Sequence, residues 1–423
     1  MRAVRAAGAA LLLVAAACAP LDDLGRDKTS APDLLVLKRT SFSVLADWPS
    51  SDVRPALQAF QRSCVKLKAR EDTAGFGGVP AYGTVGDWRL ACSSALQAEV
   101  QSADAARGFF ETWFVPAQAF NGDEERGLYT GYYEPELKGS RKRSARFNVA
   151  LYARPGDLVQ VDLGAFRPAL KGERVAGRVQ DGKLVPYATR AQIVSSGLPG
   201  TSAIAFVDDA AAAFFLHIQG SGRVQLESGE VIRAAYDGQN GHPYTAVGRV
   251  LVDRGEIARD KLSMQSIRAW LDAHPGKAEA LMNENPSYVF FKELPIADPV
   301  MGAAGAQGVA LMPEASLAVD LKFHALGAPV WIDATSPAAV EGAGDDVLRR
   351  LLVAQDTGAA ITGAVRGDYF WGHGEDAFMK AARMKSTGGY VLFVPKAPES
   401  LSSAIPPQVE PGESGQNAPS PPQ

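Results

Sequence analysis

The sequence predicts a mixed α and β protein that is mainly β, with helices early in the chain and short strands in its centre and at its end. Apolar residues recur at helical spacing before residue 114, and after Gly131 the chain changes to short alternating runs broken by Gly and Pro, the pattern of a β domain. The chain has 423 residues, of which 46% are hydrophobic. That length can bury large cores and predicts two domains.

Amphipathic helices are predicted over residues 51–70 and 88–114. Apolar residues follow the helical period in both runs, and Asp52 near the start of the first interacts favourably with the helix dipole. The aromatic residues of these runs are predicted to pack in the core rather than to contact a substrate: Phe60, Trp88, Phe109, Phe110 and Trp113.

Short alternating runs predict the central strands. They cover residues 147–152, 158–161, 204–207, 214–219 and 224–226. Helices return over residues 242–254 and 263–273, and Ser263 is the expected N-cap of the latter. Strands resume at Tyr288 and end with the run 389–394.

The N-terminal residues indicate export and anchoring. A basic start is followed by an apolar run from Ala6 to Ala17, which is too short to span a bilayer that needs about 20 apolar residues. Residues 1–17 are therefore predicted to be a signal peptide. The small residues before Cys18 resemble a bacterial lipobox, which makes Cys18 the lipidated residue; the alternative is ordinary cleavage beside an incidental cysteine. Ala19 fits transfer to the periplasmic side of the outer membrane by enteric sorting rules, with the inner membrane left open.

Polar segments flank the expected folded body. Residues 18–33 are predicted to be a lipidated tether. Residues 397–423, rich in Pro, Ser, Gly and Gln, are predicted to be disordered.

Charge and motif content exclude several classes of function. With 43 basic against 47 acidic residues, the formal net charge of −4 gives no reason to expect nucleic acid as a partner. The five histidines lack ligand spacing and three cysteines cannot form a four-thiolate zinc site, so no metal or other cofactor is expected. Gly220-Ser221-Gly222 does not have the spacing of a nucleophile elbow.

Cys64 and Cys92 remain once Cys18 is assigned to the anchor. In an oxidising compartment the two can form a disulfide. Two buried, reduced cysteines are the alternative. A catalytic thiol is not expected, because no histidine lies close by in sequence.

The segment from Leu351 to Gly374 is the expected seat of chemistry. Asp356 and Asp368 lie at the ends of β-like runs joined by a glycine-containing turn, and each borders an apolar run. Burial at the rim of a core raises a carboxyl pKa, so such an acid can carry a proton near neutrality. An aspartate after glycine is also common in turns, where it accepts backbone hydrogen bonds.

Together with residues 316–320, this segment resembles the three-aspartate (3D) domain of the membrane-bound lytic murein transglycosylase A (MltA) family. The resemblance covers roughly residues 127–395. Six further motifs carry it, in the order 129–135, 186–190, 217–222, 236–242, 250–256 and 285–291.

The resemblance implies a double-psi β-barrel with flanking helices, interrupted by a second, smaller β insert domain with a groove between them. The expected ranges are 34–135 for the helices and the start of the barrel, 136–236 for the insert, and 237–396 for the rest of the barrel.

The family motif Gly-Asp-aromatic assigns Asp368 as the general acid and base. Asp356 matches a second family acid and is expected to tune Asp368, because a nearby carboxylate disfavours ionisation; a purely structural role is the alternative. Asp320, the third acid, is expected to fix loop geometry.

Substrate-binding residues are expected in three segments. Thr130, Tyr132 and Tyr133 close the first β segment, and only one of the two tyrosines can face a groove. Gln219 and Ser221 flank a glycine turn, for which a simple hairpin is the alternative. A polar cluster near the expected return to the barrel completes the set, unless it is a loop without a ligand: Tyr236, Asp237, Asn240 and His242.

The resemblance implies a lytic transglycosylase, a lyase that cleaves the β-1,4 bond between N-acetylmuramic acid (MurNAc) and N-acetylglucosamine (GlcNAc) and forms a 1,6-anhydro product. The implied partners are peptidoglycan strands, the membrane through the anchor, and other cell-wall enzymes. Two alternatives stay open: a two-carboxylate murein hydrolase and a non-catalytic peptidoglycan-binding lipoprotein.

Overall fold

The computed structural model describes residues 33–170, 173–337, 344–358 and 361–396. The predicted signal peptide, the predicted lipidation site Cys18 and the C-terminal tail lie outside these residues.

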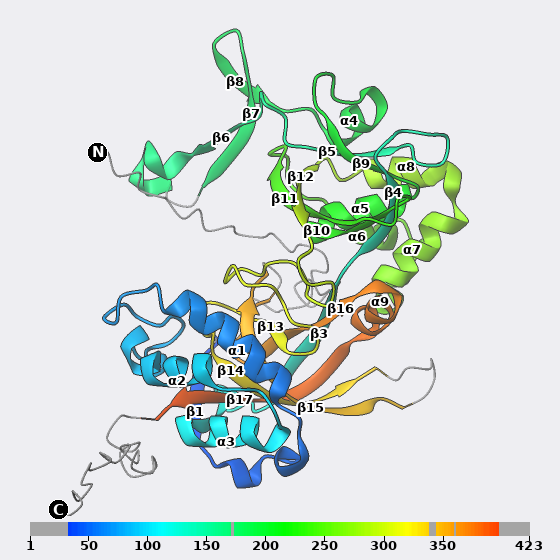
Figure 1. Cartoon of the computed structure of the whole chain (residues 1–423). Helices are drawn as coiled ribbons and strands as arrows, with labels where there is room; N and C mark the ends of the chain where they lie inside the picture. Colours follow the sequence, from blue (N-terminus) through cyan, green and yellow to red (C-terminus); the bar gives the residue numbers. More distant parts are fainter. Residues whose placement is uncertain (1–32, 171–172, 338–343, 359–360, 397–423) are drawn as a thin grey trace, which may run out of the picture.

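An eight-stranded sheet forms the lower body in Figure 1. Its order is β1 (Leu35–Arg39), β2 (Phe114–Asn121), β17 (Lys385–Pro395), β14 (Pro329–Ser336), β15 (Asp346–Asp356), β13 (Ser316–Ala318), β16 (Arg366–His373) and β3 (Gly127–Glu134). Because β17 also pairs with β3, the strands from β17 to β3 form a closed six-stranded barrel. The mixed, mainly β fold predicted from the sequence is confirmed at this level.

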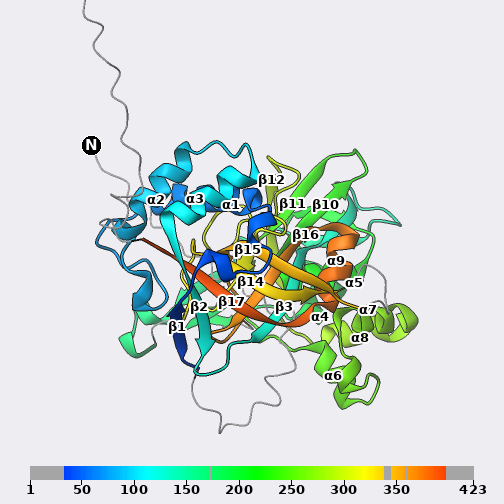
Figure 2. The same ribbon diagram turned by 90° about the horizontal axis from the view of Figure 1, so that it is seen from below.

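Three helices cover one side of this barrel, as both views show (Figures 1 and 2): α1 (Arg54–Leu67), α2 (Val85–Gln97) and α3 (Ala103–Trp113). Phe60, Trp88 and Phe110 are fully buried between helices and barrel, as predicted for core residues. The single helix expected over residues 88–114 is wrong. Ser102 starts a new helix there, because its side chain accepts a hydrogen bond from the amide of Ala105.

A disulfide joins two of these helices. The sulfur of Cys64 in α1 is bonded to that of Cys92 in α2, with Cα atoms 5.1 Å apart. Both side chains are buried, so the covalent bond lies inside the packed layer rather than on its surface.

A second sheet forms the upper body in Figure 1. Its order is β12 (Val289–Pro295), β11 (Val231–Gln239), β10 (Ser221–Leu226), β4 (Glu136–Ser140), β9 (Ala203–Val207) and β5 (Val149–Tyr152). The expected boundary at residue 236 falls inside β11, and the sheet continues to Pro295 because β12 pairs with β11 along its length.

Five helices accompany the second sheet: α4 (Arg190–Ser196), α5 (Ala210–Gln219), α6 (Val247–Asp253), α7 (Met264–Ala273) and α8 (Pro275–Asn283). Ser263 caps α7 as predicted. The strand expected over residues 214–219 is wrong, because this run is the end of α5. Asp209 caps α5 and Gly220 ends it in the left-handed region, so the glycine turn connects a helix to a strand and is not a hairpin.

The remaining elements are smaller. A three-stranded sheet projects from the upper body (Figure 1): β6 (Val159–Asp162), β7 (Arg174–Gln180) and β8 (Lys183–Pro186). Helix α9 (Gly374–Arg383) follows β16 and contacts β3. Single 3-10 turns occupy Phe42–Val44, Trp48–Ser50, Pro80–Tyr82, Leu163–Ala165, Pro168–Leu170 and Arg259–Lys261.

A buried charge cluster lies where the two bodies meet. Strand β3 of the barrel leads through Pro135 into β4 of the second sheet. Glu134, at the end of β3, accepts hydrogen bonds from Arg223 Nε (3.1 Å) and Arg233 Nε (2.7 Å). These arginines belong to β10 and β11 and also donate to the carbonyl of Met301. The contacts tie the second sheet to the end of the barrel strand.

Candidate active site

Three candidate side chains lie in one row across adjacent barrel strands. Ala318 of β13 pairs with Asp356 of β15 on one side and with Asp368 of β16 on the other. Asp368 in turn pairs with Thr130 of β3. With strands about 4.8 Å apart, the Cα atoms of the two aspartates are separated by roughly 10 Å. The barrel therefore brings the predicted acids together at one level.

Asp368 is linked to a cation through a hydroxyl. The Thr130 hydroxyl donates to Asp368 Oδ1 at 2.7 Å and accepts from Arg366 Nη2 at 2.8 Å. Burial raises the pKa of Asp368, while the positive charge of Arg366 and the Thr130 hydrogen bond oppose that rise. The carboxyl is thus desolvated, but its ionised form retains two stabilising neighbours.

Asp356 is enclosed more completely. Its Oδ1 accepts from the amide of Ala306 at 2.9 Å, and its Oδ2 accepts from the Tyr132 hydroxyl at 3.2 Å. Burial raises the pKa of Asp356 to about 6, and the charge of Asp368 adds to this rise against the opposing hydrogen bonds. The repulsion between two carboxylates is mutual, so the tuning of Asp368 by Asp356 that the sequence led us to expect stays a prediction. The charge of Arg366 favours the ionised form of Asp368.

A buried network positions the loop that holds Asp356. Gln355 donates to the Ser63 hydroxyl at 2.9 Å and accepts from Ser316 at 2.6 Å. Ser63 also donates to Gln307 at 2.7 Å, next to the Ala306 amide that binds Asp356. Helix α1 therefore supports the geometry around Asp356 from behind.

The two adjacent tyrosines of β3 separate as expected for a strand. Tyr132 reaches Asp356, and its ring lies 5.0 Å from that of Phe370. Tyr133 packs away from the acids, with its ring 5.2 Å from Phe378 of α9. Only Tyr132 of this pair belongs to the candidate site.

Asp320 makes local contacts to the backbone. Its two carboxylate oxygens accept from the amides of Lys322 and Gly363, both at 2.9 Å. These bonds join the segment after β13 to the segment before β16, the loop-fixing arrangement predicted for this third acid.

The other predicted substrate contacts lie in the second sheet and its connections, not in the barrel row. Gln219 ends α5, Ser221 begins β10, and Tyr236 and Asp237 belong to β11. Asp237 lies 3.7 Å from Lys292.

The side chains of Asn240 and His242 bind main-chain groups of the protein itself. Asn240 is buried, donates to the carbonyls of Ala188 and Pro286, and accepts from the amide of Tyr288. His242 Nε2 lies 2.8 Å from the Tyr187 carbonyl. The expectation that Asn240 contacts glycan is wrong, because its amide is engaged on both sides by the chain itself.

Arg366 is the functional neighbour that sequence reasoning missed. It stands two residues before Asp368 on β16, so both side chains point to the same face of the strand. That spacing was the available signal.

No cluster of three or more His, Cys, Asp or Glu side chains that could hold a metal ion occurs in the described part of the chain. Within the same residues, no helix is long and apolar enough to cross a membrane.

Comparison with known proteins assigns both bodies. Residues 128–292 match the family described as the MltA specific insert domain, and residues 315–394 match the 3D domain. The membrane-bound lytic murein transglycosylase A of Vibrio cholerae is 28% identical over 335 residues, covering 78% of this chain and 79% of the relative.

Two solved structures extend the comparison. The crystal structure of MltA from Neisseria gonorrhoeae, in its monoclinic form, has a TM-score of 0.74 and 33% identity, covering 86% of this chain and 94% of that one. The lytic transglycosylase LtgG of Burkholderia pseudomallei has a TM-score of 0.59 and 37% identity, covering 87% and 99%.

These relatives define the class, an enzyme of the lytic transglycosylase type, which is a lyase acting on peptidoglycan. Within that class, the chain belongs to the membrane-bound lytic murein transglycosylase A family, with a 3D domain. The family and enzyme class predicted from the sequence are confirmed.

Proposed function

We propose that the protein cleaves the β-1,4 bond between MurNAc and GlcNAc of peptidoglycan without adding water and releases 1,6-anhydromuramyl products. The observation that carries this proposal is the barrel row in which a half-buried aspartate, Asp368, stands beside a buried one, Asp356. Such a row offers one acid that can exchange a proton with a substrate and one that tunes it.

The reaction needs one acid used twice. Asp368 gives its proton to the leaving oxygen as the bond from the muramyl C1 to that oxygen breaks. The resulting carboxylate then takes the proton of the muramyl C6 hydroxyl, whose oxygen bonds to C1. The internal nucleophile is already in place, so no positioned water is needed.

The geometry favours Asp368 over Asp356 for direct proton transfer. Both oxygens of Asp356 already accept hydrogen bonds, and only 7% of the residue is exposed. Asp368 is more accessible, and its Thr130 contact engages Oδ1. Asp356 then acts on Asp368 through charge, and the two carboxyls titrate as a pair.

A second assignment makes Asp356 the proton donor. Its pKa of about 6 means that it keeps its proton to higher pH than an ordinary aspartate. Substitutions at each acid separate the two assignments, as argued in the Discussion.

For the binding surface we propose that the glycan lies between the barrel and the second sheet, with Thr130 and Tyr132 beside the scissile bond. Tyr236, Asp237, Gln219 and Ser221 are proposed contacts on the second sheet. The double-psi crossing of the barrel strands belongs to the same proposal, and its support is the likeness to the solved family structures.

The decisive experiment is digestion of purified sacculi followed by mass spectrometry of the soluble muropeptides. The anhydro product is one water lighter than the product of a two-carboxylate hydrolase, and a binding lipoprotein releases nothing. Reducing sugar ends as the main product would contradict the mechanism and favour the hydrolase.

We also propose that Cys18 carries a lipid that holds the protein on the periplasmic side of the outer membrane. Support comes from the short apolar run before Cys18 and from the membrane-bound name of the relatives. Cys18→Ser is expected to move the protein from the detergent phase to the aqueous phase of a detergent partition. Wild-type protein in the aqueous phase would contradict the anchor.

A further inference from the structure

Four of the motifs that carry the family resemblance meet at a cavity in the second sheet, away from the barrel row of aspartates. They contribute Arg190, His217, Tyr236 and Ser287 to its lining. The cavity holds about 40 Å³. One water needs about 10–15 Å³, so this space admits a small group of about three atoms rather than a sugar ring.

Arg190 is a buried cation that has no acidic partner within the described ranges of the chain. The described residues include four buried arginines, of which Arg223 and Arg233 bind Glu134 and Arg366 lies beside Asp368. Arg190 is only 4% exposed, yet among the described residues it forms no salt bridge.

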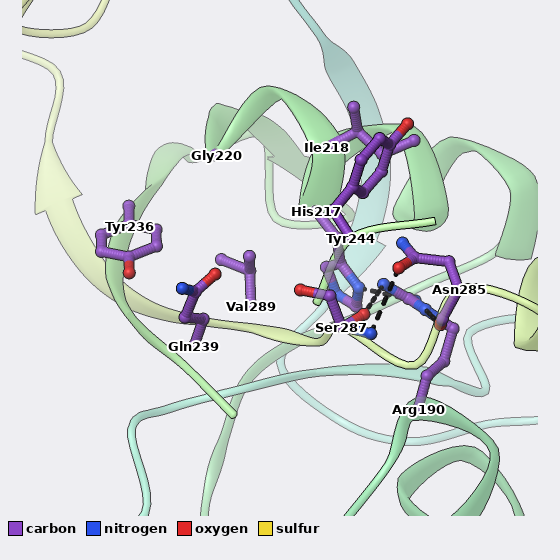
Figure 3. A pocket seen from close by; sticks show the side chains of 10 residues that line it. All are labelled: Arg190, His217, Ile218, Gly220, Tyr236, Gln239, Tyr244, Asn285, Ser287 and Val289. Atoms are coloured by element: carbon purple, nitrogen blue, oxygen red, sulfur yellow. Dashed lines mark hydrogen bonds between the residues drawn. The ribbon is translucent and has the colours of Figure 1, made fainter. Parts of the chain in front are cut away.

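Neutral groups hold Arg190 in place (Figure 3). It donates to the carbonyls of Asn285 (3.2 Å) and Ser287 (2.7 Å) and contacts His217 Nδ1 at 2.9 Å. Its guanidinium also lies over the rings of Phe214 and Tyr288. Ring faces offset part of the cost of burying a charge, but not the absence of an anion.

His217 lines the same space and carries a second donor. An arginine can only donate, so His217 Nδ1 accepts and the ring hydrogen is on Nε2. That Nε2 is buried and has no hydrogen-bond partner among the described residues. The ring packs against Tyr288, with centroids 4.3 Å apart. Burial, together with the nearby positive charge of Arg190, lowers the pKa of His217 well below its ordinary value, so the ring is neutral.

The cavity therefore combines a buried cation with an unmatched N–H donor and lacks an acceptor of matching charge. We infer that it binds a carboxylate of the murein peptide stem. Stem carboxylates are the acidic groups that distinguish murein strands from neutral chitin-like glycans. Figure 3 places Tyr236 and Gln239 on the opposite side of the cavity from Arg190, where the rest of the ligand would leave it. The inference rests on the proposed function, because it takes murein as the substrate.

The first test uses wild-type protein and needs no substitution. Histidine labelled with ¹⁵N at Nε2 alone gives at most five signals from the five histidines, and His217→Gln identifies that of His217. A soluble muramyl peptide with free carboxyls is titrated against the same compound with its carboxyls amidated. We expect the free acid to shift the His217 signal and to bind at least about tenfold more tightly, because hydrogen bonds to charged groups are the stronger ones.

His324 provides an internal control for that titration. It is also buried, but its Nε2 already lies 2.7 Å from the Ala364 carbonyl in the barrel, so its signal should not move. Equal affinity for the acid and the amide, or an unmoved His217 signal, overturns the inference. Acetate alone is the third probe: if it shifts His217 at the same concentration as the muramyl peptide, the peptide stem is not the ligand.

Substitutions give the second test. Arg190→Gln should abolish the preference for the free acid. Arg141→Gln, which removes the same charge from an exposed arginine paired with Glu230 and Glu293, should retain it. If Arg190→Gln does not fold, the wild-type titration still decides.

Digestion of sacculi separates this inference from the proposed function. Anhydro products without any preference for the free acid would overturn the carboxylate site alone. A clear preference without anhydro products would overturn the mechanism alone.

Discussion

Asp356 and Asp368 flank Ala318 of β13, and both burial and the charge of Asp368 raise the pKa of Asp356. The two carboxyls differ in what surrounds them. Arg366 and Thr130 stabilise the ionised form of Asp368, whereas Asp356 is enclosed by a backbone amide and a tyrosine hydroxyl. Environments that differ in this way separate the protonation states of an acid pair.

Relative to the wild type, the Asp356→Asn variant should gain stability as the pH is raised from acid to neutral. The pKa of Asp356 is about 6 in the folded protein and 3.8 as the reference, so between these values the unfolded chain binds fewer protons. Stability then falls as pH rises through this window and stays lower above it. The wild type thereby loses about 3 kcal/mol of its free energy of unfolding, and the variant, which has no carboxyl at this position, does not. Urea unfolding of both proteins at pH 4 and pH 7.5 measures the difference between their free energies of unfolding. If that difference is the same at both pH values, the raised pKa of Asp356 is contradicted.

Thr130→Val should move the alkaline limb of the pH–rate profile upward. The Thr130 hydroxyl lowers the pKa of Asp368 by donating to it, so its removal raises that pKa and keeps the acid protonated to higher pH. The rate should fall about fivefold, because the loss of one hydrogen bond worth about 1 kcal/mol raises the activation free energy by that amount. Thr130→Ser retains the hydroxyl and is the matched control. An alkaline limb that moves the same way in both variants would rule out the hydrogen bond as the cause.

The sequence predicted the position of the two acids well because their signal is local. Asp356 follows an apolar run and Asp368 precedes one, and both indeed lie at the rim of the barrel core. The support behind Asp356 was not predictable in this way. Gln355 bonds Ser63 across 292 residues of sequence, and Ala318 lies between the acids only because β13 pairs with both neighbouring strands.

The two errors in the second body have different causes. The run 214–219 is apolar on all sides because α5 is buried, and such a run cannot be distinguished from a buried strand by periodicity alone. The flanking caps, Asp209 and Gly220, were the better signal. Asn240 was assigned to the glycan because it is polar, whereas its partners, Ala188 and Pro286, are far from it in sequence.

Removal of the disulfide should destabilise the protein without changing its chemistry. Cys64 and Cys92 are 28 residues apart, and a loop of that length contributes about 3–4 kcal/mol in the chain-entropy estimate. The Cys64→Ala/Cys92→Ala variant should melt at lower temperature but keep the wild-type pH–rate profile at permissive temperature. Because α1 also supports Gln355 through Ser63, a shifted pH profile in this variant would instead show that the bond helps to position Asp356.

Asp368→Asn should abolish release of anhydromuropeptides while the fold and glycan binding remain, because the amide keeps shape and hydrogen bonding but cannot transfer a proton. General acid–base catalysis contributes about 10²–10⁴-fold, and one residue here serves both steps, so the loss should reach the upper end.

Asp356→Asn should be milder and should move the alkaline limb of the pH–rate profile to lower pH. Without the Asp356 carboxyl, the titration step near pH 6 is absent. Asp368 then titrates alone and loses its proton at lower pH, because Arg366 and Thr130 favour its ionised form. Both variants are compared on sacculi by mass spectrometry, with thermal melts to establish folding. A folded Asp368→Asn protein that still forms anhydro product at near the wild-type rate would transfer the catalytic role to another acid, with Asp356 as the first to examine.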